Sequence, residues 1–478
     1  MLASSSRPSP YQVAFVLGEM LLMGAGTVLA LWIRLPDPAA ELFTWRYSWH
    51  RVVLVPLVLQ ATFYYFDLQN FRIARPFVWT IARVAQAMAV GLTVLAVIYY
   101  LVPRLYLGRG VLVLCFFTIS TLVLLWRGLY AWALRQQLFS TRVALVGSGS
   151  MADSILEELV SRSDNVYNVV CLVNPADPDD PAHPCRTHPI DLMEAWARLL
   201  KTEVRHDTDN LEGLVRYYQA DLVVVAMDQR RGCMPLKELL RCRMLGVPVM
   251  QGEDFFEAIA GRILAEHIKT SWLIFSPGFH TSPLRRFTKR AFDIFFSLLG
   301  LILSSPLALL TALAIRLEGP GPILYRQERV GQYGRVFTIY KFRSMVPDAE
   351  EHTGPVWARE GDQRVTRVGR VIRRLRLDEI PQLWNVLKGD MSFVGPRPER
   401  PHFVERLQAR LPYYAERHNV KPGVTGWAQT CYPYGASEAA ALEKLNYDLY
   451  YIKHSSLSLD LLILVQTIRL LLFGGGGR

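Results

Sequence analysis

Long apolar stretches dominate the first 135 residues of the chain, at roughly 12–33, 52–66, 77–102 and 111–133. A helix that crosses a membrane needs about 20 apolar residues. The first, third and fourth stretches supply them, and the second reaches that length only with its flanking residues. The first carries Glu19 and has no clear cleavage site, so we do not expect a removed signal peptide. The pattern predicts a four-helix transmembrane domain at 1–140.

The sidedness of this domain depends on its basic flanks. Four crossings put both ends of the domain on one side of the membrane. Arg127, Arg135 and Arg142 follow or end the fourth stretch. Because basic residues are enriched on the cytoplasmic side, this cluster favours the cytoplasm for both ends.

From residue 141 the apolar runs become short and alternate with polar segments. Arg142–Val146 leads into Gly147-x-Gly149-x-x-Ala152 and a helical stretch, which is the strand, glycine turn and helix of a dinucleotide-type fold. The remaining pattern predicts strands at Val169–Val173, Leu222–Ala226 and Val247–Met250, and helices at Ser154–Ser161, Leu211–Gln219 and Leu236–Leu245. We therefore predict a Rossmann-like α/β domain at 141–262. The second strand ends in Asn174-Pro175 without an acidic residue for a ribose. A structural or regulatory domain is the favoured interpretation, and a dinucleotide site is the alternative.

A fifth apolar stretch, Phe292–Ile315, follows a segment at 263–283 that we expect to be a linker. This stretch is long enough to cross the membrane. However, Lys289 and Arg290 precede it, Arg316 follows it, and Ser305-Pro306 interrupts its middle. Proline removes a backbone donor and breaks or kinks a helix. We predict a re-entrant helix at 290–316 that enters one leaflet and returns, with Lys289 and Arg290 in the headgroup layer. A fifth crossing is the alternative.

The densest chemistry lies between 317 and 456. Phe337–Phe342 alternates like a strand and ends in Lys341-Phe-Arg343. Arginines then recur between apolar residues from Arg364 to Arg376, which predicts a basic amphipathic helix. That helix could lie on an anionic membrane surface, aim some arginines at phosphates, or simply present a solvated face.

Next comes Leu377-Asp378-Glu379-Ile-Pro381, ending at Lys388-Gly389. Proline favours the first turn of a helix, and a cation followed by glycine is typical of its end. We predict a helix from about 379 to 388 with Asp378 at or next to its N-cap, near the positive end of the dipole. An ordinary structural N-cap is the alternative for Asp378.

Two further turns and a terminal helix complete this region. Arg397 lies between Pro396 and Pro398, which aims its guanidinium rigidly, and Pro422–Gln429 forms a glycine turn. The apolar stretch Leu457–Phe473 predicts a helix long enough to lie in the membrane interface. Together these patterns predict a C-terminal α+β catalytic domain at 284–478.

Composition narrows the function classes. Of 478 residues, 51% are hydrophobic and 20% charged, which excludes a disordered or fibrous chain. The net charge is +11, and only nine of the 53 basic residues are lysines. An arginine excess suits phosphate or carboxylate recognition, although an arginine-rich codon usage explains it equally well. The six cysteines are scattered without a C-x-x-C pair, so we expect neither a disulfide scaffold nor a zinc module.

The motifs of 284–475, taken in order, resemble the bacterial sugar transferase family, the monotopic phosphoglycosyl transferases. The membrane helices and Rossmann-like domain before them resemble those of the large members, the undecaprenyl-phosphate glucose or galactose phosphotransferases. The resemblance implies transfer of a sugar 1-phosphate, with glucose favoured, from a UDP-sugar to undecaprenyl phosphate with release of UMP. This reaction begins the assembly of an exopolysaccharide, O-antigen or capsule repeat unit.

The resemblance also implies roles for residues. Asp378 would be the nucleophile that forms a phosphosugar–aspartyl intermediate, and Glu379 would act beside it. Mg²⁺ would be held at these two carboxylates. Phosphate binding would fall to Lys341, Arg343, Arg373 and Arg397, and nucleotide or sugar binding to Arg329, Pro422, Gly423, Thr425 and Gln429. Lys289, Arg290, Ser305 and Pro306 would define the re-entrant helix. We expect a homodimer in the bacterial inner membrane with its catalytic domain on the cytoplasmic face, membrane lipid as a partner, and no nucleic acid.

Two other function classes fit the sequence less well. A membrane-bound NAD-dependent dehydratase or epimerase of nucleotide sugars would need a Tyr-x-x-x-Lys pair, and no lysine here has tyrosine four positions before it. A membrane sensor or scaffold would not need the cluster of Arg, Pro and acidic residues at 320–430.

Overall fold

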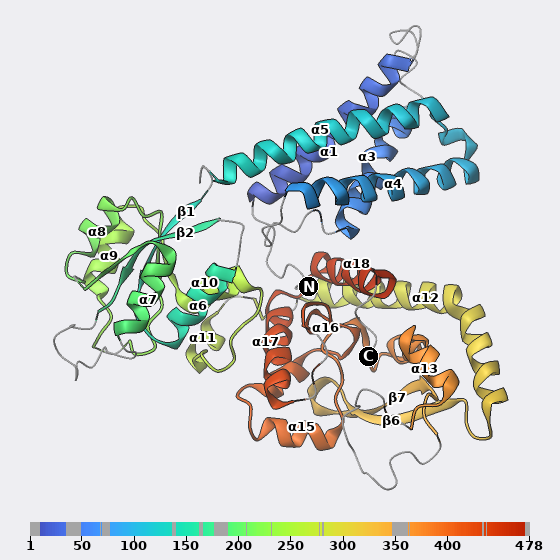
Figure 1. Cartoon of the computed structure of the whole chain (residues 1–478). Helices are drawn as coiled ribbons and strands as arrows, with labels where there is room; N and C mark the ends of the chain where they lie inside the picture. Colours follow the sequence, from blue (N-terminus) through green and yellow to red (C-terminus); the bar gives the residue numbers. More distant parts are fainter. Residues whose placement is uncertain are drawn as a thin grey trace. The chain divides into compact units, whose positions relative to one another are not determined.

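The computed structural model describes residues 10–34, 49–66, 68, 77–135, 140–161, 166–175, 190–206, 208–230, 232–276, 278–279, 282–346, 362, 364–432, 435 and 437–473 (Figure 1). The chain divides into two compact units between Phe255 and Phe256.

The N-terminal unit begins with the four predicted helices, α1 (Pro10–Arg34), α3 (Trp49–Tyr65), α4 (Phe77–Leu101) and α5 (Arg109–Arg135), with the short helix η2 (Pro103–Leu105) before α5. Helix α1 packs against α3 and α5, and α4 packs against both α3 and α5. Their core includes Met23, Leu59, Met88 and Ile119, while Leu21 and Leu125 face outward. Helices α1, α4 and α5 are long and apolar enough to cross a membrane, whereas α3, with 17 residues, is shorter.

A buried ion pair joins α1 to α5. The Arg127 guanidinium lies 2.7 Å from the Glu19 carboxylate and also donates to the carbonyl of Leu68 at 2.8 Å. A lone charge in an apolar helix bundle is costly, so each of these groups supplies the counter-charge of the other. The assignment of Arg127 to a basic cytoplasmic flank is therefore wrong, because its side chain is buried inside the helix bundle and paired with Glu19.

The Rossmann-like α/β domain is confirmed as a five-stranded parallel sheet in the order β3-β2-β1-β4-β5. In the central strand, Val146 is in register with Val173 on one side and Val225 on the other, and all three are buried. The elements are β1 (Thr141–Val146), α6 (Ser150–Ser161), β2 (Tyr167–Val173), α7 (Ile190–Leu200), β3 (Glu203–Arg205), α8 (Leu211–Tyr217), β4 (Leu222–Val225), α9 (Leu236–Met244), β5 (Val249–Gln251) and α10 (Gly252–Ala260). The apolar pattern did not reveal β3 or α7.

Cysteines add one feature that the sequence did not predict. Cys115, Cys171, Cys242 and Cys431 are free and buried, whereas Cys233 is disulfide-bonded.

The C-terminal unit mixes helices with two small sheets. Strands β6 (Leu324–Val330) and β7 (Val336–Phe342) form an antiparallel hairpin around η3 (Gln332–Gly334), and β8 (Ser392–Val394) pairs in parallel with β9 (Gly423–Thr425). The helices are α11 (Thr270–Phe275), α12 (Pro283–Glu318), α13 (Arg367–Arg374), η4 (Leu377–Glu379), α14 (Gln382–Lys388), α15 (Pro401–Gln408), η5 (Tyr414–Asn419), α16 (Trp427–Cys431), α17 (Glu438–His454) and α18 (Leu457–Phe473).

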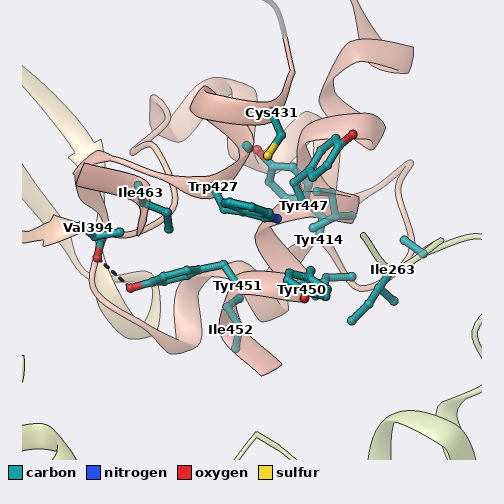
Figure 2. Close-up of a cluster of buried hydrophobic side chains, with 14 of the residues drawn as sticks. Ile263, Val394, Tyr414, Trp427, Cys431, Tyr447, Tyr450, Tyr451, Ile452 and Ile463 are labelled. Atoms are coloured by element: carbon teal, nitrogen blue, oxygen red, sulfur yellow. Dashed lines mark hydrogen bonds between the residues drawn. The ribbon is translucent and has the colours of Figure 1, made fainter. Parts of the chain in front are cut away.

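The core of this unit is built around Trp427, whose neighbours include Tyr414 and Tyr450 (Figure 2). Ile263 belongs to the same core, and its backbone N–H donates to the carbonyl of Asn446 at 3.0 Å. The Trp427 indole likewise donates to the carbonyl of Gly261 at 3.0 Å. The prediction of a linker at 263–283 is therefore wrong. The described residues of this segment include Ile263 and Trp272 of the core of the C-terminal unit, and the boundary between the units precedes them.

Helix α12 is one continuous helix of 36 residues with Pro306 inside it, so the predicted break is also wrong. Figure 1 shows that α12 bends along its length instead. Proline 306 has no N–H for the carbonyl of Ile302, and the Ser305 hydroxyl donates to that carbonyl at 2.8 Å. The hydroxyl thus satisfies the acceptor that the proline leaves without its helical donor.

Both ends of α12 pack against other elements of the C-terminal unit. Asp293 accepts a hydrogen bond from the backbone N–H of Phe393 at 3.0 Å, and Ile315 packs with Phe342. Between these anchors, large apolar side chains are exposed, among them Leu298, Leu299, Ile302, Leu303, Leu307, Leu309, Leu310 and Leu313.

Candidate active site

Asp378 and Glu379 lie on η4, a short turn between α13 and α14. Arg376 precedes the turn in the left-handed region, with φ 55°, and so redirects the chain out of α13. Helix α14 begins at Gln382 with Pro381 as its N-cap. The prediction that Asp378 caps this helix is therefore wrong, because a separate turn intervenes. The predicted end is confirmed, with Gly389 at φ 98° as the C-cap.

Three cations surround the Glu379 carboxylate. Arg397 Nη2 lies 2.8 Å from Glu379 Oε1, Lys341 Nζ lies 3.5 Å from the same atom, and Arg376 Nη1 lies 3.7 Å from Oε2. Burial by itself would raise the pKa of Glu379, but these three charges outweigh it and hold the pKa far below its usual range. Glu379 is therefore ionised at neutral pH and holds these three cations together.

Asp378 shows the opposite shift. Burial and the negative charge of Glu379 raise the pKa of Asp378, and the charges of Lys341, Arg373 and Arg397 lower it only in part. The pKa values of the two adjacent carboxyls are thus shifted in opposite directions, which is a pattern typical of functional sites. A carboxylate of higher pKa is also the more basic and hence the more nucleophilic of the two.

Asp378 and Glu379 form a dyad of adjacent carboxyls. Lys341 and Arg397 approach this dyad from separate elements. Lys341 is on β7, and burial lowers the pKa of its ammonium while Glu379 opposes that shift. Arg397 follows β8 in the turn Val394–Pro398. A small pocket borders the cluster through Arg397, and its other lining residues are Val330, Gly331, Pro396, Pro398, Arg417, His418, Val420 and Pro422.

Two arginines predicted to bind substrate have hydrogen-bond partners within the protein. The Arg343 guanidinium donates to the carbonyls of Ile315, Gly319 and Pro320, where α12 ends. Arg329 donates to the carbonyl of Pro398 at 3.0 Å and lies 3.7 Å from the Glu399 carboxylate. Arg329 therefore supports the Arg397 turn. A direct contact of either arginine with substrate stays a prediction.

The glycine turn Pro422–Gln429 packs closely against the same Arg397 turn. A Cβ atom on Gly423 would lie 2.1 Å from the backbone nitrogen of Gly395, so only glycine fits there. Thr425 is buried against Thr467 at 2.7 Å between hydroxyls, and the Gln429 amide donates to the carbonyl of Val424. Pro422 lines the small pocket. Sugar or nucleotide contacts of these residues stay predictions.

Lys289 and Arg290 also have partners within the C-terminal unit. Lys289 Nζ lies 2.9 Å from the Asp460 carboxylate and donates to the carbonyl of Val394 at 3.1 Å. Arg290 donates to the carbonyls of Val386 and Leu387, both at 2.6 Å, and so caps the end of α14. These cations join α12 to α14, the helix that follows the dyad, and to the turn that carries Arg397, a role that the sequence analysis missed.

The dyad fits a magnesium ion in its chemistry. In the described part of the chain, no group of three His, Cys, Asp or Glu side chains is arranged to hold a metal. Mg²⁺, however, commonly binds through one or two carboxylates together with substrate phosphates and water. Two adjacent carboxylates therefore suit an ion that arrives with a diphosphate.

The glycine turn of the α/β domain already holds an anion of the protein itself. The Asp228 carboxylate accepts hydrogen bonds from the N–H and the hydroxyl of Ser150, both at 2.8 Å, and from the N–H of Met151 at 3.3 Å. These groups begin α6, where a Rossmann fold binds the phosphates of its ligand. This favours the structural interpretation of the domain over a dinucleotide site.

Two family models match the chain. One, described as bacterial sugar transferase, covers residues 284–474, and the other, described as CoA-binding domain, covers 66–249. The first includes the dyad and every cation around it.

Curated proteins are similar to part of the chain. The chain is 46% identical over 240 residues to the UDP-N-acetylgalactosamine-undecaprenyl-phosphate N-acetylgalactosaminephosphotransferase of Aeromonas hydrophila, covering 50% of this chain and 56% of that protein. It is 45% identical over 186 residues to the UDP-glucose:undecaprenyl-phosphate glucose-1-phosphate transferase of Caulobacter vibrioides, covering 38% of this chain and 69% of that protein.

The similarity extends to the UDP-glucose:undecaprenyl-phosphate glucose-1-phosphate transferase of Escherichia coli, at 42% identity over 191 residues, which is 39% of this chain and 40% of that protein. The chain thus spans about half the length of the Aeromonas relative and more than two thirds of the Caulobacter one. The motifs around Asp378, the match over 284–474 and these identities agree, and on that ground the chain belongs to the bacterial sugar transferase family.

Proposed function

We propose that this protein transfers a sugar 1-phosphate from a UDP-sugar to undecaprenyl phosphate and releases UMP. The observation that carries the proposal is the asymmetric dyad. Glu379 is neutralised by Arg397, Lys341 and Arg376, while Asp378 has a raised pKa beside the same positive charge. A reaction between two phosphate anions needs such a concentration of cations next to its nucleophile.

The transfer proceeds in two displacements at one phosphorus. A carboxylate oxygen of Asp378 attacks the β-phosphorus of the UDP-sugar, and the bond to the bridging oxygen breaks, so that UMP leaves with the electron pair. A phosphate oxygen of undecaprenyl phosphate then attacks the same phosphorus, and the Asp378 carboxylate leaves. Dividing a difficult transfer into two easier steps is the advantage of covalent catalysis.

The cations around the dyad would each neutralise part of the phosphate charge. Arg373 and Arg397 lie near enough to influence the charge of Asp378, and they would neutralise the phosphates as negative charge moves onto the leaving UMP. Lys341 would bridge Glu379 and the same phosphates. Mg²⁺, held by the Asp378 and Glu379 carboxylates with the diphosphate, would supply further charge neutralisation.

The bent helix α12 would seat the site at the membrane surface. Both of its ends contact the C-terminal unit while its middle exposes leucine and isoleucine side chains. A helix anchored at both ends on one domain suits a segment that enters one leaflet and returns. Such a segment would hold the dyad near the headgroup layer, where the phosphate of the lipid substrate lies.

The wider setting of the enzyme is part of the proposal. We place it in the bacterial inner membrane with the C-terminal unit on the cytoplasmic face, at the start of exopolysaccharide or lipopolysaccharide assembly. The relatives are named for glucose and N-acetylgalactosamine, so both sugars are candidates, with glucose first. A homodimer is proposed because the membrane bundle and the α/β domain exceed what the chemistry needs.

A panel assay tests the proposal. The purified full chain is incubated with undecaprenyl phosphate, Mg²⁺ and one of UDP-glucose, UDP-galactose, UDP-N-acetylglucosamine or UDP-N-acetylgalactosamine, and UMP is measured. We expect release of UMP that depends on the lipid with at least one sugar. UMP release no greater than that of Asp378→Asn with all four would overturn the proposal.

A further inference from the structure

We propose that Arg417 is a positioning residue of this site, which fixes Arg397 against Glu379 by binding the backbone carbonyl of Arg397. Its consequence for the rate rests on the function proposed above, whereas the positioning itself is a property of the fold.

Arg417 lies on η5 and is almost completely buried, with 6% of its surface exposed. Its guanidinium donates to three acceptors: the carbonyl of Arg397 at 3.0 Å, the carboxylate of Asp448 at 2.8 Å and the hydroxyl of Tyr414 at 2.7 Å. A buried charge is tolerated only when it is paired and its donors are satisfied. The planar fork of arginine can serve three acceptors in fixed directions, which an ammonium cannot.

Asp448 supplies the counter-charge from α17. Burial raises the pKa of Asp448 to about 6, and the charge of Arg417 acts against that rise. The carboxylate is therefore ionised at neutral pH and holds the guanidinium in one orientation. Because Asp448 is itself buried, the pair is protected from solvent and forms a rigid support.

The other end of the Arg397 turn is held in the same way. The carbonyl of Val394 accepts hydrogen bonds from the hydroxyl of Tyr451 at 3.0 Å and from Lys289 Nζ at 3.1 Å. Figure 2 shows the Tyr451 hydroxyl pointing at this carbonyl. The segment from Val394 to Arg397 is thus held at both ends, by Tyr451 and Lys289 at one end and by Arg417 at the other.

A pinned backbone determines where the Arg397 guanidinium can lie. Pro396 and Pro398 restrict the turn itself, and the carbonyl of Arg397 is fixed by Arg417. The guanidinium then meets Glu379 at 2.8 Å. If the carbonyl were released, Arg397 could leave this position, and displacements on the order of 1 Å in a catalytic constellation can cost about 100-fold in rate.

The test compares Arg417→Lys with two matched controls in the full chain. Arg410→Lys makes the same change at an exposed arginine that pairs with Glu438. Tyr414→Phe removes one partner of Arg417 but leaves its bond to Arg397. Amide hydrogen exchange is measured on the peptide that contains Val394–Arg400. We expect about tenfold faster exchange in Arg417→Lys, the size of effect for loss of one hydrogen bond, and no change in the controls.

Kinetics then separate positioning from a merely structural role. We expect Arg417→Lys to lower kcat by roughly 10- to 100-fold. In an Arg397→Ala background the same change should cost no further activity, because Arg417 acts through Arg397. Losses that multiply in the double variant would overturn the proposal. Unchanged exchange at Val394–Arg400 would overturn it too, even if the wild type released no UMP from any UDP-sugar.

A second variant tests the same proposal if Arg417→Lys does not fold. Arg417→Gln combined with Asp448→Asn replaces the buried ion pair by a neutral pair and leaves no lone buried charge. The same faster exchange and the same lack of a further loss in the Arg397→Ala background are expected. Wild-type exchange in this neutral variant would contradict the proposal.

Discussion

Arg397 and Glu379 are separated by 18 residues in the chain, and their charged groups lie 2.8 Å apart. The contact joins the turn after β8 to the turn η4, so it depends on how the whole C-terminal unit folds. Glu379 also gathers Lys341 and Arg376, and Asp378 stands beside this group. The chemistry proposed for Asp378 follows from that neighbourhood.

Replacing Asp378 by asparagine should abolish transfer without unfolding the protein. The amide keeps the shape of the side chain but cannot attack phosphorus. Because burial and Glu379 raise the pKa of Asp378, its ionised form is disfavoured in the folded state, so the thermal midpoint should stay the same or rise. Asp390→Asn, at the end of α14, is the control and should keep full activity. A rate above about a tenth of wild type, roughly 1.4 kcal/mol in barrier, would exclude Asp378 as nucleophile.

The rate should fall in acid at a higher pH than an ordinary aspartate would give. The attack needs ionised Asp378, and its pKa is raised above the usual 3.8. As the pH falls through the raised pKa, the carboxylate is protonated and activity is lost. Single-turnover rates across the acidic range measure this limb. Lys341→Met removes a charge that lowers the pKa of Asp378, so it should move the limb to higher pH. A limb at or below 3.8 in the wild type, or a shift to lower pH in the variant, contradicts this assignment.

Elements with a strong local pattern could be predicted from the sequence. The alternation at Phe337–Phe342 corresponds to β7 (Val336–Phe342), and the glycine turn after Arg142–Val146 correctly indicated a parallel α/β domain. The dyad and two of the cations around it, Lys341 and Arg397, could be named as well, because charge, proline and glycine mark them in the chain, whereas Arg376 was missed.

Contacts that depend on tertiary packing could not be predicted. The left-handed Arg376, which separates η4 from α13, has no local signal, since a non-glycine residue adopts that conformation only when its surroundings impose it. The segment at 263–283 is typical of a linker in sequence because Ser276-Pro-Gly and Thr281-Ser-Pro283 interrupt its apolar pattern, yet Ile263 and Trp272 are buried in the core. The contacts of the Arg343 guanidinium with the carbonyls at the end of α12 also depend on tertiary packing, and its role as a phosphate ligand stays a prediction.

The ion pair between α1 and α5 should behave as a unit. Glu19→Gln or Arg127→Met alone leaves a buried charge without its partner and should cost roughly 3–5 kcal/mol. The double variant Glu19→Leu/Arg127→Met removes both charges and should recover most of that loss. Unfolding of the detergent-solubilised protein by dodecyl sulfate measures the difference, with Arg104→Met at an exposed site as the control. Equal and additive losses would show that the pair is not coupled.

Pro306 and Ser305 should control the path of α12. Pro306→Ala restores the N–H that proline lacks and favours a straight helix by about 3 kcal/mol on propensity alone. A straight apolar helix of this length can cross the bilayer, so the C-terminal unit would lose the cytoplasmic location that we propose for it. Ser305→Ala alone leaves the carbonyl of Ile302 without its 2.8 Å partner and should destabilise the bend without straightening it. Changing both residues should lower activity more than Ser305→Ala does.

Chemical labelling of a single engineered cysteine reports on which side of the membrane the C-terminal unit lies. Arg374→Cys, on the exposed face of α13 in a chain whose native cysteines are replaced, should resist a reagent that reaches only the periplasm. The same site should become reactive in Pro306→Ala and in the double variant, and UMP release should fall in proportion. Ser297→Ala, also on α12, is the matched control and should change neither. If the double variant keeps full activity and stays protected, packing at Asp293 and Ile315 sets the bend, and the proline does not.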